Sequence, residues 1–347
     1  MHSLMLKEIY QQKEALLRLK QFYFIENKPV LPFNMRYDFD EIKFVASGSS
    51  YNAGLVGRYL FSKYTNKASN CEYSSEFIKN NTLNIKKNTL YCFISQSGET
   101  YDTKLALEAA KASGAVCLSI TNNPNSSIYT KSDIKIDSLA GSEYSIAATK
   151  SFLTSVVCVW MIAVSFMINE GKFSFDDEKE FLNEAINAIS DTIKLEPLIK
   201  NAGGKLYDEN GIVLIGEGYP YVIARELALK IKETSYINAN AYPTGEFIHG
   251  HVALLNKNKT VIALLDETIS ETEIYAFKKM KDSFKPNITS ISPLTNEFEN
   301  SIVLNKYKSQ IAKITALTVA SQLLAYHIAL KSGNDIDNPE GLNKVIK

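Results

Sequence analysis

The sequence predicts an α/β protein of two similar modules, each a doubly wound parallel sheet flanked by helices in three layers. The chain has 347 residues, which fits two domains that each enclose a core. Short apolar runs alternate with helical stretches, as in a parallel sheet buried between helices. The stretches VASGSSYNAG (45–54) and LIGEGYPYVIA (214–224) both lead from a strand through a small-residue loop into a helix. This shared plan indicates an internal duplication.

The first module is expected over residues 1–175 and begins with a helix over about 4–24. Its strands are expected at the apolar runs 43–46, 89–94, 116–120 and 134–136. Helices are expected at 99–112 and 150–168. The last of these, Ser151 to Ile168, is nearly uncharged and approaches the length of a membrane span. It contains four hydroxyl residues and we find no second segment like it, so we expect a buried helix.

The second module is expected over residues 176–347. Its strands are expected at the runs 212–215, 260–265, 288–291 and 302–304. Helices are expected at 177–199 and 309–331. In open parallel sheets, ligands bind where the strands end and loops feed helix N-termini. The loops are therefore the place to look for function.

Composition excludes several classes of function. The 38 basic and 38 acidic residues cancel, which removes the positive field that general binding to nucleic acid or anionic membranes needs. A small anionic ligand remains compatible with the sequence. The four cysteines are far apart and indicate reduced thiols. The first ten residues lack the apolar core of a secretory peptide, so we expect a cytoplasmic protein.

Three loops carry small and hydroxyl residues just after predicted strands: FISQSGETYDT (93–103), ASGSSYNAG (46–54) and TNNPNSS (121–127). Hydroxyls and unpaired N–H groups at a helix N-terminus form a site for an anion such as phosphate. For the first loop the alternative is an ordinary helix cap, because serine and threonine are preferred there. None of the loops has the pattern of a dinucleotide fingerprint or a P-loop.

The helix that begins near Ala224 places Glu226, Lys230 and Glu233 on one narrow face, because they are spaced i, i+4 and i+7. A carboxylate beside a lysine can move a proton next to a carbonyl. The alternative is an exposed Glu–Lys pair of little consequence. Two of the four histidines, His249 and His251, flank Gly250 in the following loop. They suit proton transfer, and since no third or fourth ligand accompanies them we expect no zinc site.

Six blocks together resemble the double-SIS (sugar isomerase) family, which includes the isomerase domain of glucosamine-6-phosphate synthase. In family order they are GSSYNAG, SQSGET, TNNPNSS, SIAATKSF, the stretch from Glu226 to His249, and DNPEGLNKV, and they span Gly48 to Val345. The resemblance implies two tandem SIS domains, each a flavodoxin- or Rossmann-like three-layer unit. It also implies a phosphorylated amino sugar as substrate, with no metal or organic cofactor.

The resemblance implies a role for each matching residue. Glu233 would move a proton between carbons 1 and 2 of the sugar, supported by Lys230 and Glu226. His249 would assist ring opening in the active site of a neighbouring subunit, so a homodimer with shared active sites is expected. Lys344 would contact the substrate. The remaining contacts to the phosphate and sugar would come from Ser50, Ser95, Gln96, Ser97, Thr100, Ile146 and Ala147.

Two departures favour one branch of the family. No nucleophilic cysteine follows Met1, so we expect that this chain alone does not hydrolyse glutamine. Ala148 stands where the synthase typically has a serine that contacts the substrate. The stretches SIAATKSF, ARELALKIKE and NPEGLNKV look more similar to stand-alone SIS-type glucosamine-6-phosphate deaminases. This resemblance implies conversion of glucosamine 6-phosphate to fructose 6-phosphate and ammonia. The alternatives are a fructosamine-6-phosphate deglycase, another phosphosugar isomerase, and a non-catalytic phosphosugar sensor.

Overall fold

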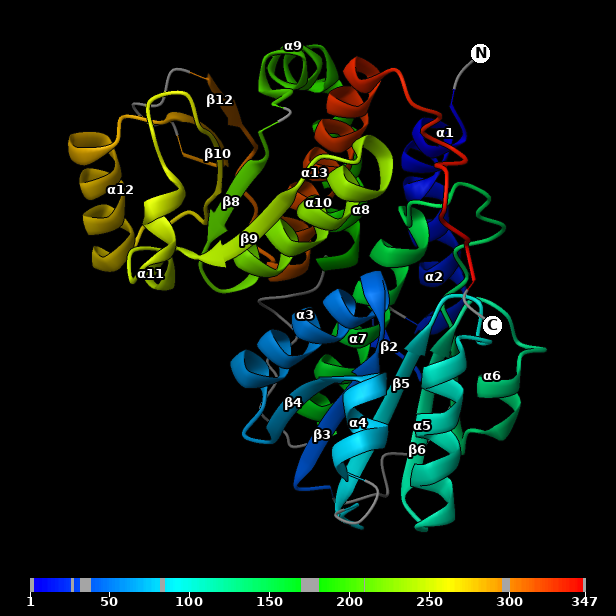
Figure 1. Ribbon diagram of the computed structural model, residues 1–347. Coiled ribbons are helices and arrows are strands. Elements are labelled where there is room, and N and C mark those ends of the chain that lie inside the picture. Colours follow the sequence, from blue (N-terminus) through cyan, green and yellow to red (C-terminus); the bar gives the residue numbers. More distant parts are fainter. Residues whose placement is uncertain are drawn as a thin grey trace. The chain divides into compact units, whose positions relative to one another are not determined.

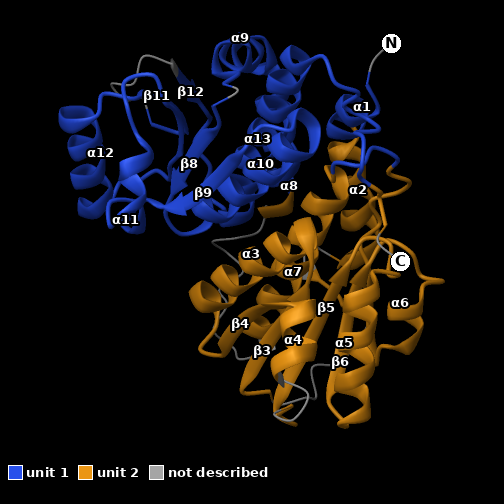
Figure 2. Cartoon of the chain, in the orientation of Figure 1, with its two compact units in different colours: residues 1–10, 144–147, 183–342 blue, residues 11–143, 148–182, 343–347 orange. Residues whose placement is uncertain are grey.

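The computed structural model describes residues 3–25, 28–31, 39–81, 85–169, 181–208, 210–294 and 300–345. The chain forms two compact units, coloured separately in Figure 2. Unit 1 contains residues 1–10, 144–147 and 183–342, and unit 2 contains residues 11–143, 148–182 and 343–347. Each unit therefore takes short pieces from the other half of the sequence. The expected module boundary at residue 175 lies outside the described residues and stays a prediction.

Unit 2 is built on a five-stranded parallel sheet with the strand order β4-β3-β5-β6-β7 (Figure 1). The strands are β3 (Glu41–Ala46), β4 (Ala68–Tyr73), β5 (Thr89–Ser95), β6 (Val116–Thr121) and β7 (Ile134–Asp137). Strand β5 is central and buried along its whole length. Its continuous apolar sequence follows from burial on both faces of the sheet.

Helices cover both faces of this sheet. On one face, α4, α5 and α6 enclose a core that includes Phe77. On the other face, α3 and α7 pack together, and the ring of Phe44 in β3 contacts Phe61 of α3. Gly57 permits this approach, because a Cβ there would lie 2.5 Å from Val159 of α7. The remaining elements and bounds of unit 2 are α2 (Gln12–Tyr23), β1 (Phe24–Ile25), β2 (Lys28–Pro29), α3 (Gly48–Tyr64), α4 (Ser74–Asn81), α5 (Tyr101–Ala112), α6 (Ser127–Lys131) and α7 (Lys150–Asn169).

Unit 1 is built on a second five-stranded parallel sheet with the strand order β12-β11-β10-β8-β9. Helices α11 and α12 pack with the core on one face, and α10 and α13 pack against each other beside the sheet. The strands are β8 (Ile212–Gly216), β9 (Ala239–Pro243), β10 (Thr260–Leu264), β11 (Asn287–Ser292) and β12 (Asn300–Val303). The helices are α1 (Leu4–Tyr10), α8 (Phe181–Lys194), which begins in unit 2, α9 (Glu196–Leu206), α10 (Tyr219–Ser235), α11 (Thr244–Phe247), η1 (His251–Leu254), α12 (Glu271–Ser283) and α13 (Gln310–Ser332).

The two sheets have the same topology. If the strands of each unit are numbered 1 to 5 along the chain, both sheets have the spatial order 2-1-3-4-5. This confirms the α/β fold class and the duplication expected from the two opening loops. In this topology the order reverses between the first and third strands, and ligands bind in the crevice outside the carboxyl ends there. In unit 2 these strands are β3 and β5, which the GSS and SQSGET loops follow.

All eight predicted strands are present, but the sequence analysis missed one edge strand in each sheet. Strand β4 has no fully buried position, and its residues alternate between exposed and half-buried. Strand β9 is short and ends at Pro243. Both carry polar residues, so they lack the apolar run by which the other two edge strands, β7 and β12, were recognised.

The predicted helices at 99–112, 150–168 and 309–331 agree with α5, α7 and α13 to within two residues. The single helix expected over 4–24 is wrong, because a turn at Gln11 separates α1 of unit 1 from α2 of unit 2. The helix expected over 177–199 is two helices that meet at Leu195, and Pro197 lies in the first turn of α9. A proline is favoured in the first turn of a helix, where its missing N–H needs no partner. Residues 177–180 lie outside the described part.

Two helices among the described residues are long and apolar enough to cross a membrane, Lys150–Ile168 and Gln310–Ser332. The expectation of only one such segment is therefore wrong. Of the apolar window in each, 89% and 94% is buried inside the structure. Helices that are apolar on all sides also occur in the cores of large globular proteins, which agrees with the buried helix expected at Ser151 to Ile168.

Candidate active site

The loop between β5 and α5 is organised by its own hydrogen bonds. The hydroxyl oxygen of Ser95 lies 2.9 Å from that of Thr100 and accepts the N–H of Gly98 at 3.0 Å. The hydroxyl of Ser97 accepts the N–H of Glu99 at 3.1 Å. These bonds fold the chain back at Gly98, where φ is 66°. The loop therefore brings three hydroxyl groups to the N-terminus of α5 without a ligand.

The helix-cap alternative does not account for Thr100. Thr100 is the N-cap residue of α5, yet within the described residues its side chain makes no capping hydrogen bond and contacts Ser95 instead. A helix whose first N–H groups lack a side-chain cap retains the partial positive charge that attracts anions. By contrast, Ser126 does cap α6, through a hydrogen bond from Tyr129 N–H at 3.4 Å.

The TNNPNSS loop lies against the SQSGET loop. The N–H of Asn122 donates to the carbonyl of Gln96 at 3.0 Å. The carboxylate of Glu99 accepts the N–H and the hydroxyl of Ser127, at 2.6 and 2.9 Å. A Cβ at position 98 would lie 1.9 Å from the Ser126 hydroxyl oxygen, so only glycine fits there. The two loops form one continuous rim at the carboxyl end of the sheet.

The third predicted loop opens α3 beside this rim. Gly48 has φ 59° and Ser50 lies half-buried in the first turn of the helix. Strand β3 pairs with β5 in parallel, with Ala46 opposite Ile94, so the two strands end side by side. Unit 2 therefore gathers Ser50, Ser95, Gln96, Ser97 and Thr100 at the ends of two neighbouring strands.

Helix α10 in unit 1 carries a buried Glu–Lys–Glu cluster. The Lys230 ammonium lies 2.5 Å from a Glu233 oxygen and 3.5 Å from a Glu226 oxygen. The side chains of Lys230 and Glu226 are 1% and 3% exposed, and that of Glu233 is 21% exposed. The alternative of an exposed surface pair is therefore wrong. Only the Glu233 end of the cluster is open enough to meet a ligand.

The neighbouring Lys232 points elsewhere, as the helical spacing predicts. Its ammonium donates to the carbonyl of Ala239 at 2.9 Å. Burial, followed by the positive charge of Arg225, lowers the pKa of Lys232 from its ordinary value. This lysine hydrogen-bonds α10 to β9, and that hydrogen bond lies outside the Glu226–Lys230–Glu233 cluster.

The two loop histidines differ in their surroundings. His249 follows α11 and is exposed, and its N–H donates to the carbonyl of Glu246 at 3.0 Å. The ring of His251 lies 4.4 Å from the ring of Tyr242. Gly250 between them has φ 137°, a backbone conformation that other residues rarely adopt. Both histidines are exposed, and His251 in addition packs against the ring of Tyr242.

The segment before α7 holds the remaining predicted contacts. Ile146 and Ala147 belong to the short piece 144–147 that is part of unit 1. The N–H of Ile146 donates to the carbonyl of Asp337 at 3.3 Å. The carboxylate of Glu8 accepts the Ser145 hydroxyl at 2.6 Å. Glu8 is buried, so the N-terminal helix α1 fixes the segment in which these two residues lie.

Lys344 is paired with a buried carboxylate that the sequence analysis did not identify. Its ammonium donates to Glu143 at 2.7 Å, and the Glu143 side chain is fully buried. Burial alone would raise the pKa of Glu143, but the charge and hydrogen bond of Lys344, together with hydrogen bonds from Ser151, lower it to about 2. One sequence signal could have identified Glu143: it is an acidic residue shortly before an apolar helix, where negative charge is favoured.

The predicted residues fall into two sets. Unit 2 holds the hydroxyl rim and the Lys344–Glu143 pair, and unit 1 holds the α10 cluster, His249, Ile146 and Ala147. Ser95 and Thr100 are in direct contact, Gln96 and Ser97 lie in the same loop, Ser50 lies at the end of the neighbouring strand, and the three residues of the α10 cluster contact one another. His249 lies in the loop after α11, at a separate place in unit 1.

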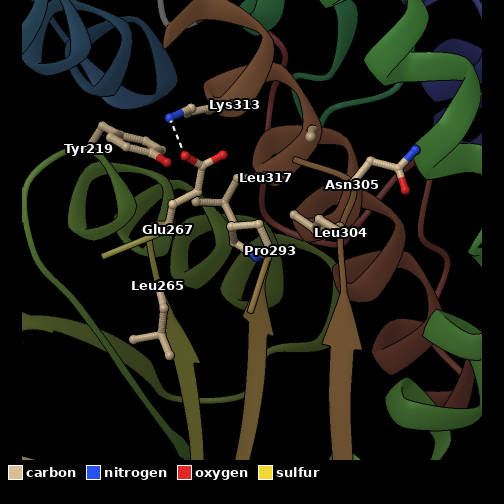
Figure 3. Close-up of a pocket in the computed structure, with 9 residues that line it drawn as sticks. Tyr219, Leu265, Glu267, Pro293, Leu304, Asn305, Lys313 and Leu317 are labelled. Carbon is tan, nitrogen blue, oxygen red and sulfur yellow. Dashed lines mark hydrogen bonds and ion pairs between the residues drawn. The ribbon is translucent and has the colours of Figure 1, made fainter. Parts of the chain in front are cut away.

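A pocket at the carboxyl end of the unit 1 sheet contains none of the predicted residues (Figure 3). Figure 3 shows the Lys313 ammonium directed at the Glu267 carboxylate, and their distance is 2.7 Å. The hydroxyl of Tyr219 donates to Asp266 at 2.8 Å, and Glu217 accepts the Ser270 hydroxyl at the same distance. The described loops at this end of unit 1 thus carry three carboxylates, Glu217, Asp266 and Glu267, and Lys313 is paired with Glu267.

No group of three or more His, Cys, Asp or Glu side chains within the described ranges is placed to hold a metal ion. All four cysteines are free thiols. Burial raises the pKa of the Cys92 and Cys158 thiols well above the ordinary value, and that of Cys117 to about 12. These three remain protonated at neutral pH, which is unfavourable for nucleophilic catalysis.

The model of the SIS domain family matches this chain twice, over residues 37–165 and 205–330. The glutamine–fructose-6-phosphate aminotransferase (isomerizing) of Campylobacter jejuni is 34% identical over 308 residues, which cover 88% of this chain and 51% of that protein. The enzyme of the same name from Francisella tularensis is 34% identical over 364 residues, with 99% and 58% covered. The chain spans about half the length of the curated relatives it matches.

Solved structures agree with this similarity. The C-terminal domain of glucosamine-fructose-6-phosphate aminotransferase from Francisella tularensis superimposes with a TM-score of 0.89 at 29% identity, covering 98% of both chains. A glucosamine-6-phosphate deaminase from Thermotoga maritima gives a TM-score of 0.78 at 22% identity, covering 99% of both chains. At 22% identity, the similarity to the Thermotoga maritima deaminase shows a shared fold only.

Proposed function

This chain belongs to the SIS domain family, and we propose that it is an enzyme that acts on a phosphorylated amino sugar by moving a proton between carbons 1 and 2. The reaction we propose is conversion of glucosamine 6-phosphate to fructose 6-phosphate and ammonia. The observation that carries the proposal is the buried Glu226–Lys230–Glu233 cluster with its one accessible carboxylate. The names of the relatives, which act on fructose 6-phosphate, support the substrate class.

In this proposal the hydroxyl rim of unit 2 binds the phosphate group and the sugar hydroxyls. Ser95, Ser97 and Thr100 offer hydroxyl donors at a helix N-terminus, where a dianion is stabilised by N–H groups and by the helix dipole. Ser50 and Gln96 complete the set, and Ile146 and Ala147 contact the sugar. Anchoring the phosphate converts a weak encounter into a positioned reaction, which is a large part of what an isomerase supplies.

Glu233 is the proposed base. After ring opening it removes the proton from carbon 2, leaving an enol with hydroxyl at carbon 1 and the amine at carbon 2. Return of the proton to carbon 1 gives an iminium at carbon 2. Water adds to that carbon, and ammonia leaves to give fructose 6-phosphate. The Lys230 ammonium, 2.5 Å from Glu233, holds the carboxylate in one orientation and opposes its negative charge, while Glu226 balances the charge of Lys230.

His249 is the proposed ring-opening residue, acting in the site of a neighbouring subunit, and Lys344 contacts the substrate. A homodimer and a cytoplasmic location are parts of the same proposal, as is the division into modules at residues 1–175 and 176–347. The exposure of His249 in a loop after a short helix supports a role toward another molecule. No metal or organic cofactor enters any of these steps.

A second candidate is the same interconversion run in the direction of amino-sugar synthesis. The similarity to the C-terminal domain of the Francisella tularensis aminotransferase, at a TM-score of 0.89, favours it. Ala148, where relatives of the synthase type typically carry a serine that contacts the substrate, favours deamination instead. The chemistry of Glu233 is the same for both directions.

The test is ammonia release by the purified chain with glucosamine 6-phosphate, galactosamine 6-phosphate or a fructosamine 6-phosphate, with Glu233→Gln as control. We expect ammonia and a ketose phosphate in equal amounts from glucosamine 6-phosphate only. Product from the fructosamine 6-phosphate instead would identify a deglycase. No product from any of them, with thermal stabilisation by the same ligands, would contradict the deaminase proposal and indicate an isomerase with another substrate or a sensor.

A further inference from the structure

Glu143 occupies an unusual place for a carboxylate. It lies between β7 and α7, and its side chain is fully buried. One oxygen accepts the N–H groups of Thr149 and Ser151 at 3.0 and 3.1 Å and the Thr149 hydroxyl at 3.1 Å. The other accepts the Ser151 hydroxyl at 2.5 Å. Four donors at the start of α7 therefore hold this carboxylate in one orientation.

The fifth donor comes from the far end of the chain. The Lys344 ammonium lies 2.7 Å from Glu143, across a separation of 201 residues. A buried carboxylate is costly unless it is hydrogen-bonded and its charge is compensated. The four donors near α7 satisfy its hydrogen-bonding capacity, and Lys344 supplies the compensating charge. The Lys344 side chain is itself 21% exposed, so its ammonium is held at the edge of the buried region.

The segment before Lys344 is anchored differently. The Asp337 carboxylate accepts the N–H groups of Leu4 and Met5 and the hydroxyl of Ser3 in unit 1. The last residues, 343–347, belong to unit 2. Within the part of the chain that the structure describes, Glu143 is the charged partner of Lys344. The position of the tail lysine in unit 2 thus depends on one buried carboxylate.

We propose that Glu143 is the positioning residue for Lys344: its buried carboxylate fixes the tail lysine in unit 2, in the place from which Lys344 contacts the phosphosugar. That Lys344 contacts the substrate rests on the proposed function. That Glu143 anchors Lys344 rests on the structure alone. Glu143 does not touch the substrate itself. It acts through the ammonium that it holds and through the start of α7.

A structural role alone would give different results. Glutamine has the same shape as glutamate and keeps one carbonyl oxygen that can accept from the α7 donors. If Glu143 served only to cap α7, Glu143→Gln would therefore change the stability of unit 2 but not the anchoring of residues 343–345. If Glu143 positions Lys344, the same substitution removes the charge that holds the ammonium. Glu8→Gln is a matched control, because Glu8 is also buried and accepts a serine hydroxyl, but it holds Ser145 instead of Lys344.

The experiment measures anchoring without reference to activity. Trypsin cuts after lysine, so cleavage after Lys344 reports release of the tail and can be followed by intact mass. We expect Glu143→Gln to be cut at least about tenfold faster than wild type, because a charge-assisted hydrogen bond is lost, and Glu8→Gln to be cut at the wild-type rate. Equal cleavage rates in Glu143→Gln and wild type would overturn the proposal.

A second measurement covers the case in which Glu143→Gln does not fold. Lys344→Met keeps Glu143 and its four donors at the start of α7, and hydrogen exchange of the peptide containing residues 336–345 should then become faster by a larger factor than exchange in α7. Unchanged exchange of that peptide would overturn the anchoring.

Activity then tests the positioning role separately. Glu143→Gln and Lys344→Met should lower kcat/KM for the phosphosugar by similar factors, and the double variant should be no worse than either single one. Factors that multiply in the double variant would overturn positioning through Lys344. Failure of the proposed function would instead appear as no turnover by wild type, with the trypsin and exchange results unaffected.

Discussion

Replacement of Lys230 by methionine tests the central feature of the proposed site. Methionine has a similar length and fits an apolar interior, so the substitution removes the charge with little change in volume. The Lys230 side chain is 1% exposed, and Glu226, 3.5 Å away, is 3% exposed. Without the ammonium, Glu226 becomes a buried carboxylate that has lost its compensating charge. Breaking a buried ion pair in this way costs roughly 3–5 kcal/mol.

That cost gives a measurable change in thermal stability. For a unit of this size it lowers Tm by roughly 10 °C, measured by calorimetry or by circular dichroism. Glu233→Gln should lower Tm far less, because Glu233 is 21% exposed and its removal leaves Lys230 with Glu226. The double variant Lys230→Met, Glu226→Met should recover most of the lost stability, since an apolar pair can replace a buried ion pair.

Activity must respond differently from stability. Ammonia release should fall in both Lys230→Met and the double variant, because Glu233 loses the group that orients it. A Tm within about 2 °C of wild type for Lys230→Met would refute the reasoning, since exposed ion pairs contribute only about 1 kcal/mol or less. So would full activity of the double variant, because the cluster would then be a stability feature only.

The remaining predictions concern single residues of the proposed site. Glu233→Gln should lower ammonia release by about a hundredfold or more, while thermal stabilisation by glucosamine 6-phosphate persists; loss of that stabilisation would contradict a role as base. Thr100→Val should raise KM by about tenfold with a smaller change in kcat, because one hydrogen bond to the phosphate is lost; steady-state kinetics distinguish this from a pure kcat effect. Inactive Glu233→Gln and His249→Asn subunits, refolded together in equal amounts, should recover about a quarter of wild-type activity if each site takes its histidine from the partner subunit, and no recovery would place both residues in one subunit. The lowered pKa of Glu143, about 2 against an ordinary 4.5, stabilises the fold above pH 4.5, and this contribution is lost as the pH falls through about 2; acid unfolding of Glu143→Gln should lack it.

The sequence was sufficient for the parts of the fold that are buried on both sides. Strand β5 is buried throughout and reads as an unbroken apolar run, so its position follows from local composition. Edge strands β4 and β9 carry polar residues and proline, and only their pairing with β3 and β8 makes them strands. The turn at Gln11 could not be predicted either, because the two helices that it separates belong to different units and this division has no local sequence signal.

The candidate site divides in the same way. Helical spacing alone predicts that Glu226, Lys230 and Glu233 share one face of α10, but spacing cannot tell an exposed face from a buried one. Helix α10 packs against α13, which lies about 90 residues further along the chain, so burial on α10 has no local signal. Glu143 was missed for a related reason, since Lys344 lies 201 residues away and no local pattern links the two.

The duplicated sheets have different electrostatic surroundings at their carboxyl ends. In unit 2 the loops after the first and third strands carry serines and a threonine with one carboxylate, Glu99, whereas in unit 1 the corresponding loops carry Glu217, Asp266 and Glu267, with one lysine, Lys313, beside them. The carboxylates of unit 1 therefore repel a phosphate dianion more strongly. We therefore expect each chain to bind one phosphosugar, although the fold occurs twice.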